Sequence, residues 1–414
     1  MAEDKIRVPF HRASITEAEE NAVLDVLRSG WLTTGQRTLE FERKFSEAVT
    51  EKDGGAAESV RTARKSIGLT DAPVKSLAVN SNTSGMLLAM EACGVGPGKS
   101  VLTTPYTFVS TAACARHLGA DVVFADIEKD SYSIDSGSIE RILSNDTGHK
   151  IAAVVPVHVG GNVCRMDRIC AAAKKHGAAV IEDAAHAFPS PTSLGYAGTV
   201  GDAGVFSFYA TKTITTAEGG MVCTRNPELA RRMETMRMHG MDRTAWDRYT
   251  SPRASWEYDI VAPGYKFNLP DILSAIGICQ LERAERFHSR RKATAEKYNR
   301  AFSGMDFVSL PPDGPGNSWH LYLLRLVPEK LRISRQEFAG KLQQAGIGIS
   351  VHFIPLFHFS YWKALYPDFS AENFPNAESQ YSRTISIPIW PDMTDSDSDL
   401  VIETVARIGK ENHA

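Results

Sequence analysis

The chain has 414 residues, of which 43% are hydrophobic and 23% are charged, and its formal net charge at pH 7 is −3. This length suggests two domains, and the small charge gives no broad attraction to nucleic acid or to anionic membranes. No apolar run is long enough to cross a bilayer, and the charged stretch 1–8 lacks the apolar segment of a secretory signal. We therefore expect a cytoplasmic protein that binds neither nucleic acid nor membrane.

The cysteine and charge patterns favour structural roles over binding sites. The six cysteines form no C-x-x-C pair and several lie in apolar runs, so we expect buried free thiols and no bound metal. A basic run at 288–292 lies between acidic residues in a helical stretch. We interpret it as a solvated helix face rather than a nucleic-acid patch.

The N-terminal part is predicted to begin with a helix. The pattern Ser-Ile-Thr-Glu at 14–17 is typical of a capping box, apolar residues follow at helical spacing, and Gly30 is placed to end the helix. The polar stretch 50–76 carries a Gly-Gly pair and weak periodicity. We interpret it as a surface excursion that contains a helix.

From residue 77 onward, short apolar runs alternate with helical stretches such as 85–93 and 166–176. The runs predict buried strands at 100–104, 121–125, 151–157, 178–181, 204–208 and 221–224. Strands that alternate with helices predict an α/β fold with a mainly parallel sheet. Functional residues should gather at the carboxyl ends of its strands.

After about residue 253 the pattern becomes α+β. It predicts a long helix over 270–302, strand-like segments at 319–327 and 346–353, and helices at 335–344 and from 396. We predict a large domain over 1–265 and a smaller α+β domain over 266–414.

Two polar residues that follow predicted strands suggest a cofactor. Asp183 comes after the run 178–181, and Lys212 comes just past the run 204–208. Pyridoxal phosphate needs an amine for its aldehyde and an anion for its pyridine nitrogen. Each residue alone has an ordinary explanation, a helix N-cap for Asp183 and an exposed side chain for Lys212. The joint pattern favours the cofactor.

Two further features fit this cofactor. The small hydroxyl residues at 81–85 precede a helix, where backbone N–H groups and the helix dipole can hold a phosphate. Ordinary capping by Asn82 or Thr83 is the alternative. Phe108 can stack on an aromatic ring, or it can be a core residue.

Short motifs recur along nearly the whole chain: Gly-Trp-Leu-Thr-Thr-Gly (30–35), Thr-Pro-Tyr-Thr-Phe (104–108), Pro-Val-His (156–158), Glu-Asp-Ala-Ala-His-Ala (182–187), Phe-Ser-Phe (206–208), Ala-Glu-Gly-Gly (217–220), Pro-Gly-Tyr-Lys-Phe-Asn-Leu-Pro-Asp (263–271) and Val-His-Phe (351–353). Together they resemble the DegT/DnrJ family of nucleotide-sugar aminotransferases. Members of that family are pyridoxal-phosphate enzymes of fold type I, similar in architecture to aspartate aminotransferase. The chain departs from the family in its longer 50–76 excursion and in 188–194, which replaces a glycine-bearing turn.

The resemblance implies cofactor roles for particular residues. Lys212 would form a Schiff base with pyridoxal phosphate, and Asp183 would pair with the pyridinium nitrogen. Phe108 would stack on the ring, and His186 would lie near it. The residues implied to bind the phosphate are Thr83, Ser84, Ser207 and, from the neighbouring subunit, Asn268. The last of these implies a homodimer with shared sites.

The resemblance also implies a substrate region and a reaction. The region would be lined or flanked by Trp31, Thr33, Thr34, His320 and His352. For His352, packing at a strand end is an equal alternative. Lys212 would act as acid and base while the amino group of L-glutamate passes, by way of pyridoxamine phosphate, to a keto sugar. The motifs at 215–220 and 263–271 look most like those of members that act at C4 of a nucleotide-linked sugar.

Three alternatives compete with this interpretation, and the sequence argues against the second and the third. A keto-cyclitol aminotransferase would share these motifs. A sugar dehydratase of the same family would carry histidine in place of Lys212. A non-catalytic regulatory protein with this fold would usually carry a DNA-binding module, and the chain has no basic helix-turn-helix segment at either end.

Overall fold

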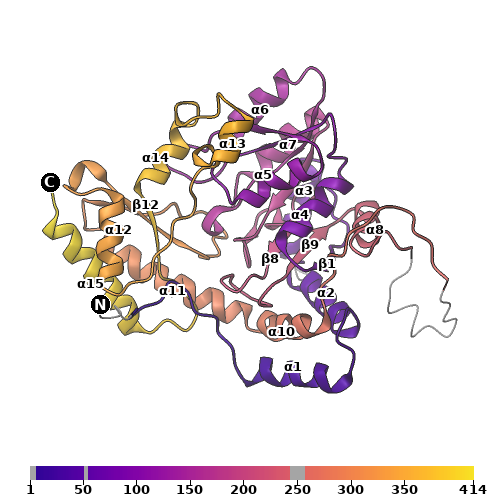
Figure 1. The fold of residues 1–414 in the computed structure, drawn as a ribbon, viewed down its shortest axis with the longest axis horizontal. Coiled ribbons are helices and arrows are strands. Elements are labelled where there is room, and N and C mark those ends of the chain that lie inside the picture. The colour runs from indigo at the N-terminus through magenta and orange to yellow at the C-terminus, as the bar shows by residue number, and fades with distance from the viewer. Residues whose placement is uncertain (1–5, 51–54, 243–256) are drawn as a thin grey trace.

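The structure, a computed structural model, describes residues 6–50, 55–242 and 257–414 and is built around a seven-stranded sheet (Figure 1). The run of strands from β8 to β3 is parallel, whereas β9 is antiparallel to both of its neighbours. The predicted α/β fold is confirmed. Across the sheet the strands are β1 (Lys75–Val79), β9 (Gly220–Thr224), β8 (Ala203–Ser207), β5 (Ala179–Asp183), β4 (Ile151–Val154), β2 (Ser100–Thr103) and β3 (Asp121–Phe124).

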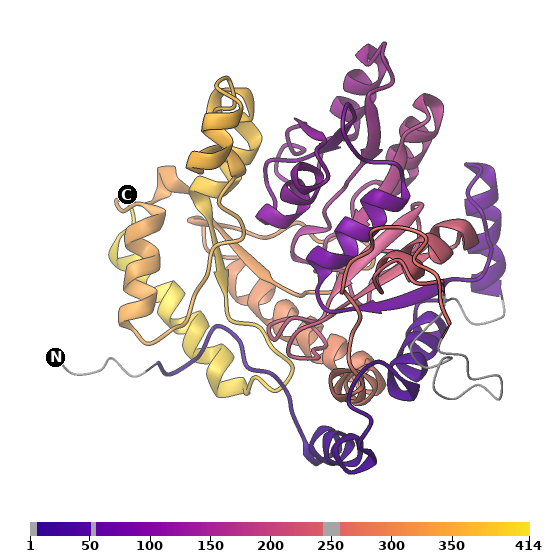
Figure 2. The same ribbon diagram turned by 45° about the vertical axis from the view of Figure 1, so that its right-hand side comes forward.

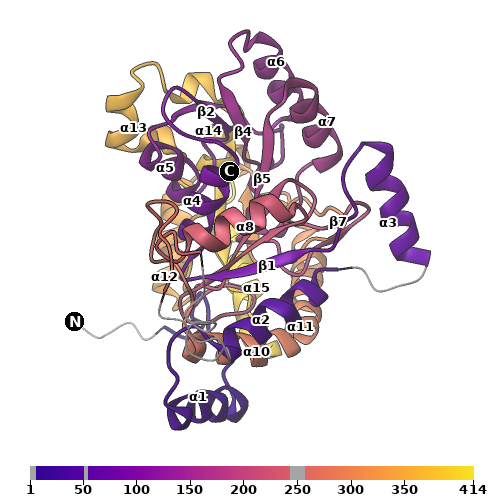
Figure 3. The same ribbon diagram turned by 90° about the vertical axis from the view of Figure 1, so that its right-hand side faces the viewer.

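Helices cover both faces of this sheet, because successive side chains of a strand point to opposite faces. Leu77 and Val79 of β1 lie in the hydrophobic cluster of α4 (Asn82–Ala92), α5 (Val109–His117) and α8 (Pro227–Met236). Ala78 between them lies in the cluster of α2 (Gln36–Ala48) and α10 (Asp271–Glu282). Figure 3 shows α4 and α8 on one side of β1, and α2 and α10 on the other. The same face as α2 also carries α6 (Ser136–Asn145) and α7 (Met166–His176).

The first helix, α1 (Glu17–Ser29), begins two residues later than its capping pattern suggested. Thr16 is the N-cap, and it forms a capping box with Glu19 rather than Ser14 with Glu17. The Glu19 carboxylate reaches back to the Thr16 backbone, which closes the box at this position. Gly30 ends the helix as predicted, with a left-handed φ of 72°. The excursion at 50–76 contains α3 (Gly55–Ser66), as expected.

The C-terminal part has its own antiparallel sheet and its own core. The sheet runs β10 (Val308–Ser309), β11 (Tyr322–Leu326) and β12 (Thr384–Ile387). Side chains from β11 and β12 pack with those of α11 (Ala284–Phe302), α12 (Arg335–Gln344) and α15 (Asp395–Glu411). The N-terminal segment joins this part, because Val8 pairs with Ile347 and lies in the same core (Figure 2). The domain boundary at residue 265 stays a prediction.

The remaining short elements frame these parts. The stretch 188–194 runs into a small hairpin instead of the glycine-bearing turn. The short elements are β6 (Pro191–Thr192), β7 (Gly195–Tyr196), α13 (Ser360–Leu365) and α14 (Pro375–Arg383). Within the described residues, no helix is both long and apolar enough to cross a membrane.

Three predictions in the C-terminal part were wrong. The segment predicted as a single helix over 270–302 consists of two helices, α10 and α11, with Arg283 between them. The Arg283 side chain donates to the Glu19 carboxylate of α1. The segment 346–353 is not a regular strand, because it pairs only at isolated bridges, to Val8 and to Ser386. Arg291 is not on a solvated helix face but is fully buried. Its guanidinium donates to the carbonyls of His320 and Ile389, which explains the burial.

A buried ion pair ties α2 to the sheet. The Glu42 carboxylate accepts from the backbone N–H of Ala78 at 2.8 Å and from the guanidinium of Arg237. The Glu42 side chain is 5% exposed and that of Arg237 is 6% exposed. Removing one partner of such a pair leaves a buried charge without compensation.

We therefore expect Glu42→Ala to lower the free energy of unfolding by about 3–5 kcal/mol. Urea denaturation of the purified protein measures this. The matched control is Glu47→Ala, which removes an exposed pair with Arg43 on the same helix and should cost less than about 1 kcal/mol. Equal losses for the two variants would contradict the role of the buried pair.

Candidate active site

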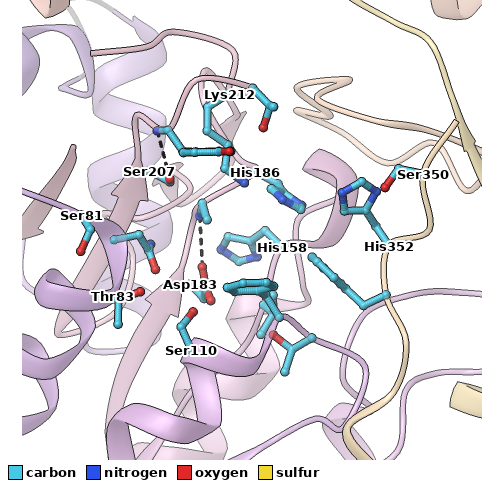
Figure 4. A pocket seen from close by; sticks show the side chains of 18 of the residues that line it. Ser81, Thr83, Ser110, His158, Asp183, His186, Ser207, Lys212, Ser350 and His352 are labelled. Atoms are coloured by element: carbon cyan, nitrogen blue, oxygen red, sulfur yellow. Dashed lines mark hydrogen bonds between the residues drawn. The ribbon is translucent and has the colours of Figure 1, made fainter. Parts of the chain in front are cut away.

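A pocket of about 500 Å³ opens at the carboxyl ends of β5 and β8 (Figure 4). The start of α4, the start of α5 and the loop after β8 contribute to its walls, and so does the distant segment 350–353. The pocket is therefore where the predicted sheet topology placed it, at strand ends. Its volume lies in the usual range for cofactor and small-molecule sites, roughly 300–1,000 Å³.

Asp183 is the last residue of β5 and lies at the base of this pocket, where it is 4% exposed. Its carboxylate accepts from the Thr111 hydroxyl at 2.7 Å and from the Ala185 N–H at 3.2 Å. The residues after it form turns rather than a helix, so the alternative of a helix N-cap does not apply. The two donors fix the carboxylate in one orientation.

Lys212 lies in the loop that follows β8 and lines the same pocket. Burial lowers the pKa of its amine to about 8, although the nearby Asp183 carboxylate raises it. Loss of hydration disfavours the charged form of an amine, so burial makes the neutral, nucleophilic form accessible near neutral pH. This is the property that a Schiff-base lysine needs.

The N-terminus of α4 forms the third side of the pocket. Ser81, rather than Asn82 or Thr83, caps this helix by accepting from the Ser84 N–H at 3.1 Å. Ser81, Asn82, Thr83 and the β8 residue Ser207 line the pocket. Ser84 does not, because its hydroxyl donates to the Asn80 side chain at 2.6 Å. Free N–H groups and the dipole at a helix start are suited to a phosphate.

A glycine allows the close approach of two strands at this point. A Cβ on Gly220 would lie 2.7 Å from the Phe206 carbonyl oxygen and 2.8 Å from the Asn82 nitrogen.

Phe108, at the N-terminus of α5, is 59% exposed and lines the pocket, so it is not a core residue. Its ring is available to stack on a flat ligand.

Three predicted histidines gather beside Lys212. The ring centroids of His186 and His320 are 4.4 Å apart, and those of His186 and His352 are 6.1 Å apart. Burial lowers the pKa of all three, to about 4 for His352, and the positive charge of Lys212 lowers each further. They are therefore neutral at pH 7. His186 and His352 line the main pocket, whereas His320 lies behind it.

Sequence reasoning missed two residues that support this site. Thr111 orients Asp183. His158 lines the pocket, and its Nε2 lies 3.1 Å from the Glu182 carboxylate while its Nδ1 accepts from the Cys164 N–H. His158 follows the predicted strand 151–157 directly, so its position at a strand end was a usable signal. Thr111 gave none, because its contact with Asp183 spans 72 residues.

The other predicted residues lie together outside this pocket. The Asn268 amide donates to the Thr34 hydroxyl at 2.6 Å, and the Trp31 indole donates to the Thr34 carbonyl at 3.3 Å. The Thr33 carbonyl accepts from the Asp271 N–H. None of these four predicted residues lines the pocket.

The residues of the main pocket fit pyridoxal phosphate. An amine with a lowered pKa, a buried and oriented carboxylate, a helix N-terminus with hydroxyl groups and an exposed aromatic face are all present in one cavity. These groups match the aldehyde, the pyridine nitrogen, the phosphate and the ring face of that molecule.

Comparisons with known proteins agree with this chemistry. The sequence profile of the DegT/DnrJ/EryC1/StrS aminotransferase family matches residues 13–69 and 72–406. The spore coat polysaccharide biosynthesis protein SpsC of Bacillus subtilis is 39% identical over 406 residues, which are 97% of each chain. The uncharacterized protein MJ1066 of Methanocaldococcus jannaschii is 39% identical over 407 residues, 98% of each chain.

Solved structures show the same relationship. A putative sugar aminotransferase of Streptococcus pneumoniae, Spr1654, in its PMP form, superposes with a TM-score of 0.84 at 29% identity and covers 98% of both chains. Helicobacter pylori PseC, an aminotransferase of pseudoaminic acid biosynthesis, gives a TM-score of 0.82 at 26% identity over 98% of this chain and 99% of its own. The expected family and cofactor are therefore confirmed. The chain belongs to the DegT/DnrJ/EryC1/StrS aminotransferase family and is a pyridoxal-phosphate-dependent enzyme.

Proposed function

We propose that this enzyme transfers the amino group of L-glutamate to the 4-keto group of a nucleotide-linked sugar. The observation that carries the transfer chemistry is the placement of the Lys212 amine and the Asp183 carboxylate in one pocket. Two relatives support the sugar substrate by their names, since SpsC belongs to polysaccharide biosynthesis and PseC to pseudoaminic acid biosynthesis.

Asp183 would hold the protonated pyridine nitrogen, and Thr111 would keep its carboxylate aimed there. Phe108 would lie against the ring, and His186 would lie at its edge as a neutral hydrogen-bonding group. The bound cofactor supplies an electron sink for the electrons of the broken Cα–H bond. The cofactor phosphate would be held at the N-terminus of α4 by Thr83, Ser84 and Ser207. Ser84 would contribute only through its position in the first turn of the helix, because its hydroxyl donates to the Asn80 side chain.

Lys212 would move the proton. Its neutral Nζ would take a proton from Cα of the donor as a general base. The protonated Nζ would then give up a proton as a general acid to complete the half-reaction. With a pKa of about 8, roughly a tenth of the amine is neutral at pH 7, compared with about three parts in ten thousand for an ordinary lysine. Burial therefore increases the active form by a factor of roughly three hundred.

Asn268 would complete the site of a neighbouring subunit, which makes the expected unit a homodimer. Its bond to Thr34, outside the pocket of its own chain, supports this arrangement. Exposed apolar side chains lie close in sequence to this group, Leu32 at 45% and Val261 at 57%, as expected of an interface. Trp31, Thr33 and Thr34 would approach the partner's substrate together with Asn268, while His320 and His352 would serve their own chain.

The first expectation concerns Lys212. When pyridoxal phosphate is added to the apoprotein and the product is reduced with borohydride, we expect covalent label on Lys212 and none in Lys212→Arg. Only the unprotonated amine reacts, and a lowered pKa extends that form to lower pH, so labelling should rise with pH with a midpoint near 8. Peptide mapping by mass spectrometry locates the label. A different labelled lysine, or a midpoint near the usual value of about 10.4, would contradict the assignment.

The second expectation concerns the acceptor. With ¹⁵N-labelled L-glutamate, a nucleotide-linked 4-keto-6-deoxyhexose should gain one ¹⁵N atom, detected by mass spectrometry. Lys212→Ala should lose roughly a thousandfold in rate, because the amine that is proposed to move the proton is gone. Amination of a keto-cyclitol but of no nucleotide sugar would replace the proposed substrate and leave the transfer chemistry intact.

The third expectation concerns sharing of the site between subunits. Lys212→Ala and Asn268→Ala homodimers should each be weak or inactive. A mixed dimer should recover about half of the wild-type activity, since one of its two sites has both residues intact. As the control, the homodimer of the double variant Lys212→Ala, Asn268→Ala should show no recovery of activity. Absence of recovery in a mixed dimer proven by mass spectrometry would refute sharing through Asn268.

A further inference from the structure

A second, much smaller cavity lies behind Lys212, on the side away from the main pocket. Its volume is about 20 Å³, and its polar walls are His11, Thr211, Lys212, His320 and His352. Thr211, Lys212 and His352 also line the main pocket. These three residues therefore separate the two spaces, and Lys212 borders both.

This cavity has the size and the polarity that one water molecule requires. Roughly 10–15 Å³ of such volume holds one water, provided that two to four polar groups surround it. Two ring nitrogens in its wall, His11 Nε2 and His320 Nδ1, are buried without a hydrogen-bond partner among the described residues. A buried polar group left unpaired costs free energy, so a bridging water would satisfy both.

We propose that this cavity holds one water which links the amine of Lys212 to His11, and that His11 relays protons between Lys212 and solvent while the main pocket is filled. The proposal rests on the proposed role of Lys212 as acid and base. It assigns a function to the N-terminal segment, which brings His11 to the site by pairing with the C-terminal part at Val8.

The direction of the relay follows from exposure. His320 is 4% exposed and is enclosed, whereas His11 is only partly buried and precedes the exposed Arg12. A proton would leave Lys212 Nζ for the water oxygen as a second proton passes from that water to His11 Nε2. The imidazolium then loses a proton to solvent. No electrons are transferred, and the water is unchanged at the end.

Burial, together with nearby positive charges, keeps His11 neutral at rest. Burial lowers the pKa of His11 to about 4, with further lowering by Arg291 and Lys212, while the backbone of Ala210 raises it. His320 and His352, which share the cavity, have lowered pKa values and are neutral as well. On the side of the main pocket, the Asp183 carboxylate faces Lys212 and raises the pKa of its amine.

The imidazolium of His11 is only a transient carrier of the proton. The pKa is about 8 for Lys212 and about 4 for His11, so a proton that reaches His11 Nε2 is passed on to solvent or returned to Lys212 rather than held.

The fate of a labelled proton tests the relay. The enzyme is supplied with L-glutamate deuterated at Cα and with ¹³C-labelled 2-oxoglutarate, and the deuterium in the newly formed ¹³C-glutamate is measured by mass spectrometry. That deuterium must pass through Lys212, so it is retained only if Lys212 does not exchange with solvent. We expect low retention in the wild type and at least a threefold increase in His11→Phe and in His11→Gln. Arg12→Gln, an exposed neighbour, should match the wild type.

A crystal structure of the wild-type holoenzyme gives an independent readout. We expect one water within hydrogen-bond distance of His11 Nε2 and His320 Nδ1, and its loss in His11→Phe. Melting curves identify any variant that does not fold, and the two substitutions of His11 guard against that outcome. Normal amino transfer with unchanged retention in a folded variant, or an empty cavity in the wild type, would overturn the relay alone. Absence of ¹³C-glutamate from the wild-type reaction would instead overturn the proposed function.

Discussion

The pairing of β5 with β8 is the constraint on which the site depends. The two strands are parallel, with Asp183 opposite Val205, so the carboxylate emerges at the edge where β8 ends two residues later at Ser207. The loop that carries Lys212 starts from that edge. A shift of one residue in this register would turn Asp183 to the other face of the sheet, because side chains alternate along a strand. The other parts of the site are arranged around this pair.

Desolvation then sets the charges at the site. Burial favours the neutral forms of Lys212 and of the histidines around it, while Asp183 has two hydrogen-bond donors. The pocket thus combines an amine with a lowered pKa, neutral imidazoles and an oriented carboxylate in a space that segment 350–353 helps to close. An amine that must gain and lose protons in such a space benefits from a separate route to solvent. The cavity at His11 lies where that route would be needed.

The sequence was most informative where signals are local. Apolar runs located six of the seven strands of the main sheet, all but β1 (Lys75–Val79), and polar residues just after two of those runs marked Asp183 and Lys212. Their joint pattern indicates pyridoxal phosphate independently of any family resemblance, and the family match confirms the cofactor. A parallel sheet makes this possible, since it gathers its strand ends at one edge.

Features that depend on tertiary contacts could not be read in this way. Arg291 lies in a basic helical run, and only the carbonyls of distant segments explain its burial. The capping residue of α4 is a neighbour of the expected ones, because capping patterns recur within a few residues of each other. His11 and Thr111 reach the site through contacts far apart in sequence, as Asn268 reaches Thr34. No local pattern reports such contacts.

The visible absorption spectrum of the purified enzyme loaded with pyridoxal phosphate tests the central claim most directly. The account predicts that L-glutamate removes the absorption band of the bound cofactor and that 2-oxoglutarate restores it, whereas Lys212→Ala gives no such reversible change. A loaded wild-type enzyme that does not respond to L-glutamate would contradict the proposed donor. Reversible exchange at the wild-type rate in Lys212→Ala would contradict the central role of Lys212.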